Sequence, residues 1–471
     1  MKRLILPLTL GLSLIAIGGC DGGDGFAGIE GTGAPVAASG TVTGFGSIYV
    51  NGLRFDTHDA DFIVEGVSGG HEDDLAPGMQ VSLRIDPDAP AGAPSALEVR
   101  YLPWLRGPVS EVSGQPEALT LTVFGQTLTL PADAAFSGVT PESLRASDWV
   151  EISALPGDPA LVTRISAAAP EAAEWLSGSV SSVDPVLQRL TIGDQAVDYS
   201  PAQLDGDAQA LSAGTPVRIR GQSDGDSFVA DWVLIGDQSL NAQAGEQVLV
   251  EGQATDVDQG PRPDFTLNGR RVSTANAEVD GGNLNMLRAS VMRVVVSGTL
   301  ADDGTLDADN IRIIRPGNQV ITGEIDSIDP QAQQLRVMGR TVRVNDFTSF
   351  EDSGPQANRQ LRLADLNPGE RVIVFATNNG QSELVATRIR RLSVQDNRPN
   401  SVQGPITRLE DPLVYLEELI VDVGAIDPDL RQSLTLQSVV AVTGERPDGE
   451  VLIAQELRVV DRADNPQNYH F

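Results

Sequence analysis

The stretch GTVTGFGSIYVNGLRFDT at residues 40–57 decides the fold of this chain. Within it, two runs of alternating apolar and polar residues flank a turn at Asn51-Gly52. Such alternation is typical of a half-buried β-strand. Asn-Gly favours a two-residue hairpin turn, because both turn positions require a positive φ. The stretch therefore predicts an antiparallel β-hairpin.

The opening pattern of this stretch, Gly-x-apolar-(Ser/Thr/Asp)-x-apolar, recurs along the chain. Its copies read GTVTGF, GPVSEV, GSVSSV, GQATDV, GEIDSI and GPITRL, and they begin at Gly40, Gly107, Gly178, Gly252, Gly323 and Gly404. The successive spacings are 67, 71, 74, 71 and 81 residues. Six copies in near-register indicate an internal repeat of roughly 70 residues.

Further landmarks follow each opening pattern. An alternating run broken by a tight turn comes first, as in LTVFGQTLTL and FTLNGRRVS, and the sixth copy departs with Glu417-Glu418 at its turn. The pattern Leu-x-x-(Gly/Ser) then precedes another apolar run, at Leu75, Leu144, Leu211, Leu287 and Leu366, and the sixth copy departs here also. Helical signal is confined to short segments such as residues 141–146 and 201–213.

Each copy predicts four or five short strands, so we expect an all-β fold of six tandem small β-barrels, OB-like in type. Closing each sheet into a barrel removes exposed edges and gives a compact core. A large sandwich or a propeller with one blade per repeat is the alternative, although blades usually repeat at about 40–50 residues. The expected boundaries are a signal peptide at 1–19, a tether at 20–38, units 1 to 6 at 39–105, 106–176, 177–247, 248–319, 320–400 and 401–461, and a tail at 462–471.

The stretch at residues 40–57, the later DLAPGMQVSL at residues 74–83 and the closing ALEV at residues 96–99 resemble domain-of-unknown-function family 5666. The resemblance is best in unit 1 and extends in looser form over residues 39–461. It implies small β-barrel-like domains that often occur in tandem in bacterial exported proteins. The family has no assigned catalytic residues, so the resemblance implies an architecture and no activity.

The first twenty residues have the pattern of a secretory signal. Lys2 and Arg3 precede an apolar run that ends at Ile-Gly-Gly-Cys20, and no other cysteine occurs in the chain. This ending resembles the lipobox of bacterial lipoproteins, and the resemblance implies that lipid is attached to Cys20 and anchors the chain. We therefore expect a cell-envelope protein whose membrane partner is reached through the lipid on Cys20. An ordinary signal peptide followed by a chance cysteine is the alternative.

Composition excludes several functions. The formal net charge is −32, the isoelectric point is near 4.3, and Lys2 is the only lysine. Nucleic-acid binding depends on cationic side chains that neutralise phosphates, so we expect no nucleic-acid partner. Phosphate-loop, Ser-x-x-Lys and Schiff-base chemistry all need a lysine, so they are excluded for the mature chain.

Residues suited to chemistry are few. The three histidines, His58, His71 and His470, have no evident nucleophile beside them. The acidic segment at residues 302–309, DDGTLDAD, resembles part of a calcium loop but lacks the terminal Glu, and a β-turn is the simpler interpretation. Arg388, Arg390 and Arg391 are expected to face solvent beside acidic neighbours. We therefore expect no cofactor, no metal and no catalytic residue.

These observations predict a non-enzymatic envelope lipoprotein that acts as a modular spacer or a protein-binding array. Six barrels in line, with links stiffened by Pro103 and Pro399, would reach about 150 Å. The alternatives are a cell-wall or carbohydrate-binding lipoprotein that uses exposed aromatics and an enzyme with carboxylate or metal chemistry. The aromatic candidates for sugar binding are Trp104, Trp149, Trp175 and Trp232.

Overall fold

The computed structural model describes residues 35–90, 92–115, 118–225, 227–236, 240, 242–288, 292–353, 357–378, 383–447 and 449–460. The predicted signal peptide, most of the tether, Cys20 and the tail lie outside these residues. The described chain is all-β, with one short α-helix, α1 (Pro428–Ser433), and 3-10 turns such as η1 (Glu72–Asp74). None of its described helices has the length and apolarity needed to cross a membrane.

Unit 3 shows the barrel most plainly. Its long first strand β14 (Glu174–Asp184) pairs with β15 (Arg189–Ile192), which pairs with β16 (Gln195–Asp198). That third strand lies parallel to β19 (Ser227–Ile235), which pairs with β18 (Pro216–Asp224), and this strand returns to the first. The ring order 1-2-3-5-4-1 is that of a five-stranded Greek-key barrel of OB type. The prediction of OB-like barrels is therefore confirmed.

The same ring recurs in the neighbouring units, with short extra strands at its edges. In unit 2 the strands are β8 (Leu105–Gln115), β9 (Ala118–Val123), β10 (Gln126–Leu130), β11 (Ala135–Ser137), β12 (Trp149–Leu155) and β13 (Leu161–Ala167). In unit 4 they are β20 (Gln247–Thr255), β21 (Phe265–Leu267), β22 (Arg270–Ser273), β23 (Glu278–Asp280), β24 (Arg293–Leu300) and β25 (Leu306–Ile314). In unit 5 they are β26 (Gln319–Asp329), β27 (Gln334–Val337), β28 (Arg340–Arg343), β29 (Ser349–Asp352), β30 (Arg371–Asn378) and β31 (Leu384–Arg391). Unit 3 adds β17 (Gln203–Asp205).

The first and last units close less regularly. Unit 1 contains β1 (Ala37–Gly44), β2 (Ile48–Val50), β3 (Leu53–Phe55), β4 (Asp61–Val64), β5 (Val67–Gly70), β6 (Gln80–Ile85) and β7 (Ala96–Tyr101). Its third strand reaches the last through a single parallel bridge, Asp56 to Ser95. Unit 6 contains β32 (Asn400–Pro405), β33 (Arg408–Glu410), β34 (Leu413–Leu416), β35 (Leu419–Asp422), β36 (Val439–Glu445) and β37 (Val451–Val459). Its first strand is split in two, so a count of six closed barrels is not confirmed.

The cores follow from the sequence pattern. Alternate residues of each strand face the barrel interior, and the landmark leucines close its end, with Leu75, Leu144, Leu287 and Leu366 at most 4 % exposed. The predicted turns at Asn51-Gly52 and Asn268-Gly269 have positive φ at all four positions. The segment at residues 141–146, which was expected to be helical, forms turns, and the one at 201–213 contains the short strand β17 and the 3-10 element η2 (Ala208–Ala210).

The units join in pairs through their first strands. Strand β1 lies parallel to β20, so units 1 and 4 share a 13-stranded sheet. Strand β8 pairs with β14, and β26 pairs with β32, so units 2 and 3, and units 5 and 6, each share a 12-stranded sheet. Each first strand therefore serves its own barrel and the barrel of another unit.

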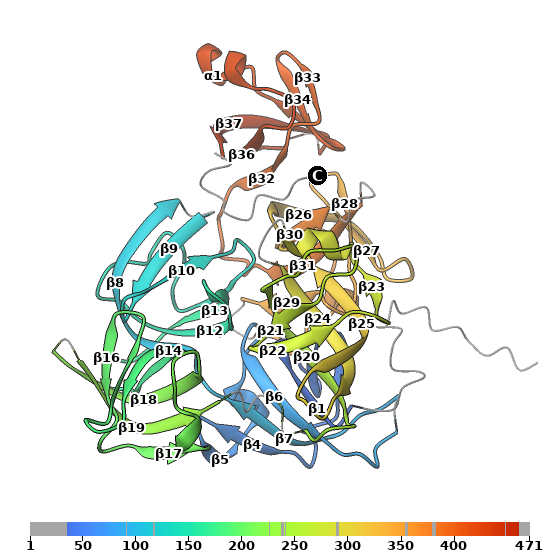
Figure 1. Ribbon diagram of the computed structural model, residues 1–471. Helices are drawn as coiled ribbons and strands as arrows, with labels where there is room; N and C mark the ends of the chain where they lie inside the picture. The colour runs from blue at the N-terminus through green and yellow to red at the C-terminus, as the bar shows by residue number, and fades with distance from the viewer. Residues whose placement is uncertain are drawn as a thin grey trace, which may run out of the picture.

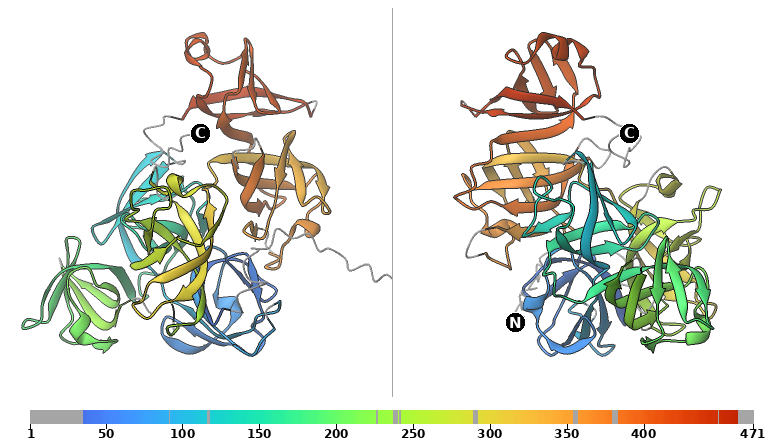
Figure 2. Two further views of the ribbon diagram at one scale, coloured as in Figure 1. Left: turned by 45° about the vertical axis from the view of Figure 1, so that its right-hand side comes forward. Right: turned by 90° about the vertical axis from the view of Figure 1, so that its left-hand side faces the viewer.

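The prediction of six barrels in line is wrong. Figures 1 and 2 show units 1 to 5 clustered together, with unit 6 projecting from the cluster. Unit 1 also contacts unit 5, because Arg359 donates hydrogen bonds to the carbonyl oxygens of Glu72, Asp73 and Leu75 at 2.7–3.0 Å. Contacts between units far apart in sequence replace the extended links that the sequence suggested.

Candidate functional site

A buried polar residue stands directly before the opening glycine of every unit. Each of these residues is 6 % exposed or less and lies on a strand that joins two units. The six residues are Ser39, Arg106, Ser177, Glu251, Thr322 and Gln403. Arg106, Glu251 and Gln403 form side-chain hydrogen bonds at these joints, whereas the hydroxyls of Ser39 and Ser177 have no partner among the described residues.

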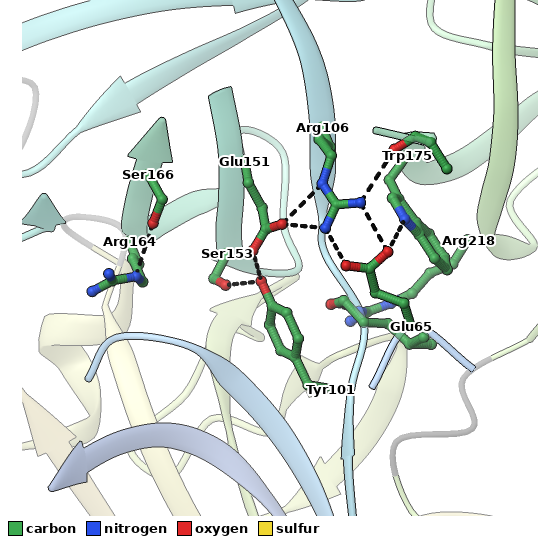
Figure 3. A network of polar contacts seen from close by, with 11 residues as sticks. Glu65, Tyr101, Arg106, Glu151, Ser153, Arg164, Ser166, Trp175 and Arg218 are labelled. Atoms are coloured by element: carbon green, nitrogen blue, oxygen red, sulfur yellow. Dashed lines mark hydrogen bonds and ion pairs between the residues drawn. The ribbon is translucent and has the colours of Figure 1, made fainter. Parts of the chain in front are cut away.

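Arg106 forms the most connected of these joints (Figure 3). Its guanidinium lies between two carboxylates, donating from Nη1 to Glu65 of unit 1 at 2.8 Å and from Nε to Glu151 of unit 2 at 2.9 Å. It also donates to the carbonyl oxygen of Ala173 at 3.3 Å. Three chain segments from units 1 and 2 and from the entry to unit 3 thus meet on one side chain.

Tyr101 and Trp175 extend this network on either side of Arg106. The Tyr101 hydroxyl donates to Glu151 at 2.6 Å and lies 3.2 Å from the hydroxyl of Ser153. The indole N–H of Trp175 lies 3.4 Å from Glu65. Charge-assisted hydrogen bonds of this kind are stronger than neutral ones, so the network fixes the relative placement of units 1, 2 and 3.

Glu65 reaches the network because of its turn. Glu65 and Gly66 connect β4 to β5, and their φ values are 54° and 82°. A two-residue turn with positive φ at both positions matches the twist of the strands. The turn presents the Glu65 carboxylate to unit 2.

The network shifts the pKa values of Glu65, Tyr101 and Arg106. Burial raises the pKa of Glu65, but the hydrogen bond and positive charge of Arg106 outweigh it and leave that pKa below its usual value. Burial, together with the negative charge of Glu151, raises the pKa of Tyr101 well above its usual value. Burial lowers the pKa of Arg106, and the two carboxylates more than compensate, so it lies above its usual value. The phenol therefore stays neutral and donates, while the ion pairs persist.

Beside this network lies a cavity of about 580 Å³, formed by units 1, 2, 3 and 4 together. Trp104 lines it, and the Trp104 residue is only 8 % exposed. Arg218 lies over the indole at 5.7 Å and donates to the carbonyl oxygen of Leu102 at 2.7 Å. An aromatic ring and a guanidinium from two different units thus meet on the cavity wall.

Three buried polar atoms that belong to lining residues have no hydrogen-bond partner among the described residues. They are the indole nitrogen of Trp104, the hydroxyl of Ser39 and the amide oxygen of Asn268. Buried polar groups without a partner cost free energy, so such groups mark a place suited to a polar ligand. The lining supplies both donors and acceptors.

Charged groups surround these atoms. Arg100, Glu251 and Asp256 are among the lining residues, and the described lining contains no histidine, cysteine or lysine. Glu251 is 1 % exposed, accepts a hydrogen bond from the backbone N–H of Thr41 at 2.5 Å, and forms an ion pair with Arg293. Its negative charge is therefore already engaged in joining unit 1 to unit 4. The cavity is equipped to form hydrogen bonds and charge contacts with a ligand.

The other candidate residues from the sequence lie apart from this cavity. Cys20 and His470 are outside the described residues, and His71 is exposed beside η1. The acidic segment at residues 302–309 forms the predicted turn between β24 and β25, where Asp303 accepts from the backbone N–H of Thr305 at 2.9 Å. Within the described part of the chain, no three His, Cys, Asp or Glu side chains are grouped closely enough to hold a metal ion.

Two expectations about exposure are wrong. Trp175 is fully buried and Trp104 nearly so, because both pack at joints between units, whereas Trp149 and Trp232 are half-buried. Arg388 is 4 % exposed, since unit 2 covers the β31 face on which it lies. A strand that would face solvent in a lone barrel faces another barrel here.

No motif in the sequence singles out Glu65, Tyr101, Arg106 or Glu151. One signal was available: the residue before each opening glycine is polar in all six units. That position stands within a strand whose neighbours are buried, and a conserved polarity of this kind across repeats marks the joints between barrels.

Comparison with known proteins finds one protein family in four of the six units. The family model described as Domain of unknown function (DUF5666) matches residues 106–163, 177–233, 251–312 and 322–390. Unit 1, where the resemblance was expected to be best, is not among the matched ranges. No curated protein matches the chain.

Among solved structures, the chain is similar to drosophila Unr CSD456, with 12 % sequence identity and a TM-score of 0.12. The similarity covers 45 % of this chain and 96 % of that chain. A TM-score this low carries no argument, so the OB-like assignment rests on the order of the paired strands. The four family matches together span just over half of the sequence, and the chain belongs to the family described as Domain of unknown function (DUF5666).

Proposed function

We propose that this chain is a non-enzymatic binding protein of the cell envelope, held at a membrane by lipid on Cys20. The single observation that carries the binding role is the cavity of about 580 Å³ at the junction of units 1 to 4. Its volume lies within the range of about 300–1,000 Å³ that small-molecule sites occupy. A spacer role is not carried forward, because the units do not form a line.

The composition of the lining supports a binding role. Nucleophilic catalysis needs a nucleophile with a base beside it, and the described lining offers no histidine, cysteine or lysine. The buried carboxylate of Glu251 is held by Arg293 and Thr41. The arrangement supports recognition of a polar ligand.

Two variants test the binding role. Arg100 lines the cavity, whereas Arg84 lies on the neighbouring strand and is exposed. Screening polar metabolites by thermal shift and tryptophan fluorescence should find a ligand that Arg100→Ala weakens and Arg84→Ala does not. Equal loss in both variants, or no ligand at all, would contradict the proposal.

The lipid anchor has its own test. Cys20→Ala should abolish labelling by a palmitate analogue and move the protein from the membrane fraction to the soluble fraction. The reason is that the thiol of Cys20 is the only one available for acylation. A wild-type chain that takes up no label would exclude the anchor and leave the binding role standing.

Carbohydrate is the second candidate, and one observation favours it. Trp104 offers an indole ring and an unpartnered N–H beside Asn268 and Arg218. Sugars combine apolar faces with many hydroxyls, so an aromatic ring with amide and charged neighbours suits them. Binding on a glycan array, lost in Trp104→Phe, would support this class, because that variant keeps an aromatic ring and removes the N–H.

A further inference from the structure

A second, smaller cavity lies between units 1, 2, 4 and 5. Its volume is about 60 Å³, several times the space that one water molecule needs. It is far below the size of a drug-like ligand site. Threonines, arginines and one aspartate from different units line it, namely Thr41, Thr163, Thr387, Arg293, Arg315, Arg388 and Asp133, and Arg293 is already paired with Glu251. The occupant must therefore be small and must accept hydrogen bonds.

Arg388 is the one arginine of this lining that is fully buried. It is 4 % exposed, and its Nε and Nη1 have no hydrogen-bond partner among the described residues. Glu351 forms an ion pair with Arg388, but its carboxylate oxygen lies 3.6 Å from Nη1, beyond hydrogen-bond length. The ring of Phe375 lies 4.3 Å from the guanidinium carbon and restricts its movement. The unsatisfied donors are thus held in place.

Other donors point to the same kind of occupant. The Nε of Arg315 and the hydroxyl of Ser349, both from lining residues, also have no partner in the described chain. The Nη1 of Arg315 donates a hydrogen bond to the carbonyl oxygen of Asn378, which carries no charge. Buried donors of this number call for an acceptor that can take several hydrogen bonds at once.

Charge balance favours an anion as that acceptor. Burial lowers the pKa of Arg388, and the positive charges of Arg390 and Arg164 act in the same direction, against Glu351 and Asp133. Arg164 is itself 7 % exposed. Excess positive charge buried in a chain of net charge −32 needs a local counter-charge.

We propose that this cavity binds one small inorganic anion, such as phosphate, sulfate or chloride, and that Arg388 is its principal ligand. The anion accepts hydrogen bonds from the free guanidinium nitrogens and joins unit 5 to units 1, 2 and 4. This site is separate from the cavity of about 580 Å³, and it requires neither a ligand there nor lipid on Cys20.

Calorimetry on the whole chain tests the proposal. Sodium phosphate, sodium sulfate and sodium chloride are titrated separately, with ionic strength held constant by sodium gluconate. We expect one of them to bind saturably with a stoichiometry of one and to raise the melting temperature. Saturation distinguishes binding from the general screening that any salt gives to a highly charged protein. If none of the three anions binds, the proposal is overturned.

A matched pair of variants locates the site. Arg388→Gln should weaken binding about ten- to hundredfold, the range expected for loss of charge-assisted hydrogen bonds. Arg84→Gln removes the same charge from an exposed position of unit 1 and should leave affinity unchanged. Unchanged affinity in Arg388→Gln overturns the assignment.

Crystallography of the wild-type chain in sodium bromide gives a second readout that no variant's folding can affect. An anomalous peak within hydrogen-bond distance of Arg388 supports the site. If calorimetry identifies chloride as the anion, a cavity that holds only water under these conditions overturns the site; if it identifies phosphate or sulfate, a crystal grown with that anion must show it beside Arg388.

Discussion

Asn51 and Asn268 lie directly over the glycines that open their units. A Cβ placed on Gly40 would lie 2.0 Å from the Asn51 amide oxygen, and one on Gly252 would lie 2.3 Å from that of Asn268. Asn51 cannot easily move, because it is 2 % exposed and donates to the carbonyl oxygen of Ser39 at 2.8 Å. The repeated glycine and the repeated turn are thus two parts of one contact.

We therefore predict that Gly40→Ala destabilises the chain by about 1–3 kcal/mol, the usual cost of overpacking. Gly92→Ala is the control, because nothing lies within 4 Å of a Cβ there. Adding Asn51→Gly should recover part of the loss, since the turn position has a φ of 56° that glycine adopts freely. Calorimetric melting of the four proteins measures this. If Gly40→Ala were as stable as Gly92→Ala, the close contact between Gly40 and Asn51 would be contradicted.

The ion pair of Glu65 with Arg106 predicts a pH dependence. Because the pKa of Glu65 is depressed in the folded state, its contribution to stability is present above the pKa of the unfolded state, near pH 4 to 4.5. The contribution is lost as pH falls through the lower folded pKa. The stability difference between wild type and Glu65→Gln should therefore be present at pH 7 and shrink below about pH 4. Denaturant titrations at both pH values measure it, and a difference independent of pH would exclude the ion pair as its cause.

Single-residue patterns predicted the turns well and the network poorly. Asn-Gly turns depend on local backbone preference, so the positive φ values at residues 51–52 and 268–269 could be read from the sequence. The partners of Arg106 lie 41 and 45 residues away, and local patterns contain nothing that selects them. The cavity residues come from four units, so they too could not be grouped in advance.

At the scale of elements, the first strand of each unit pairs with a later strand of its own barrel and with a strand of another unit. All eight residues of β1 are buried, and β20 is buried from Val248 to Ala254. Strands buried on both sides read as continuous apolar or small-residue runs rather than alternating ones. The sequence of β1, AASGTVTG, is a run of apolar and small residues, and such a run indicates that a second sheet or barrel covers the strand.

The choice of partner could not be predicted from these runs. Every unit offers a similar first strand, yet β1 pairs with β20, more than 200 residues away, and not with the adjacent β8. Side chains such as Arg106 and Glu251, which differ between repeats, give each joint its own hydrogen bonds. Pairing specificity therefore depends on the few positions where the repeats differ.

Fragments test this pairing. Residues 102–236 contain units 2 and 3, which share a sheet through β8 and β14, whereas residues 177–316 contain units 3 and 4, which share none. Both fragments contain two barrels of similar length. We predict that the first gives a single cooperative melt at a higher temperature than the second, because only the first retains its joint. Equal melting temperatures would mean that the shared sheet adds no stability.

At the scale of the whole molecule, unit 1 holds the assembly together. It shares a sheet with unit 4, meets units 2 and 3 through the Glu65–Arg106 network, and meets unit 5 through Arg359 and Arg362. The Arg362 guanidinium donates to the carbonyl oxygen of Phe45 at 2.7 Å and lies over the ring of Tyr49. Contacts to backbone carbonyls need no charged partner, so this joint depends little on ionic strength.

Small-angle X-ray scattering tests the assembly as a whole. A compact chain of this length has a radius of gyration of about 23 Å, whereas six barrels in a line about 150 Å long would give about 43 Å. The projecting unit 6 adds to the compact value, so we predict about 25 Å.

The net charge of −32 would drive loosely linked barrels apart at low salt, where screening is weak. Because shared sheets and buried hydrogen bonds join the units, the radius should change little between 20 mM and 500 mM salt. A radius near 43 Å, or one that falls steeply with added salt, would show that the barrels are strung together and that the four-unit cavity does not exist in solution.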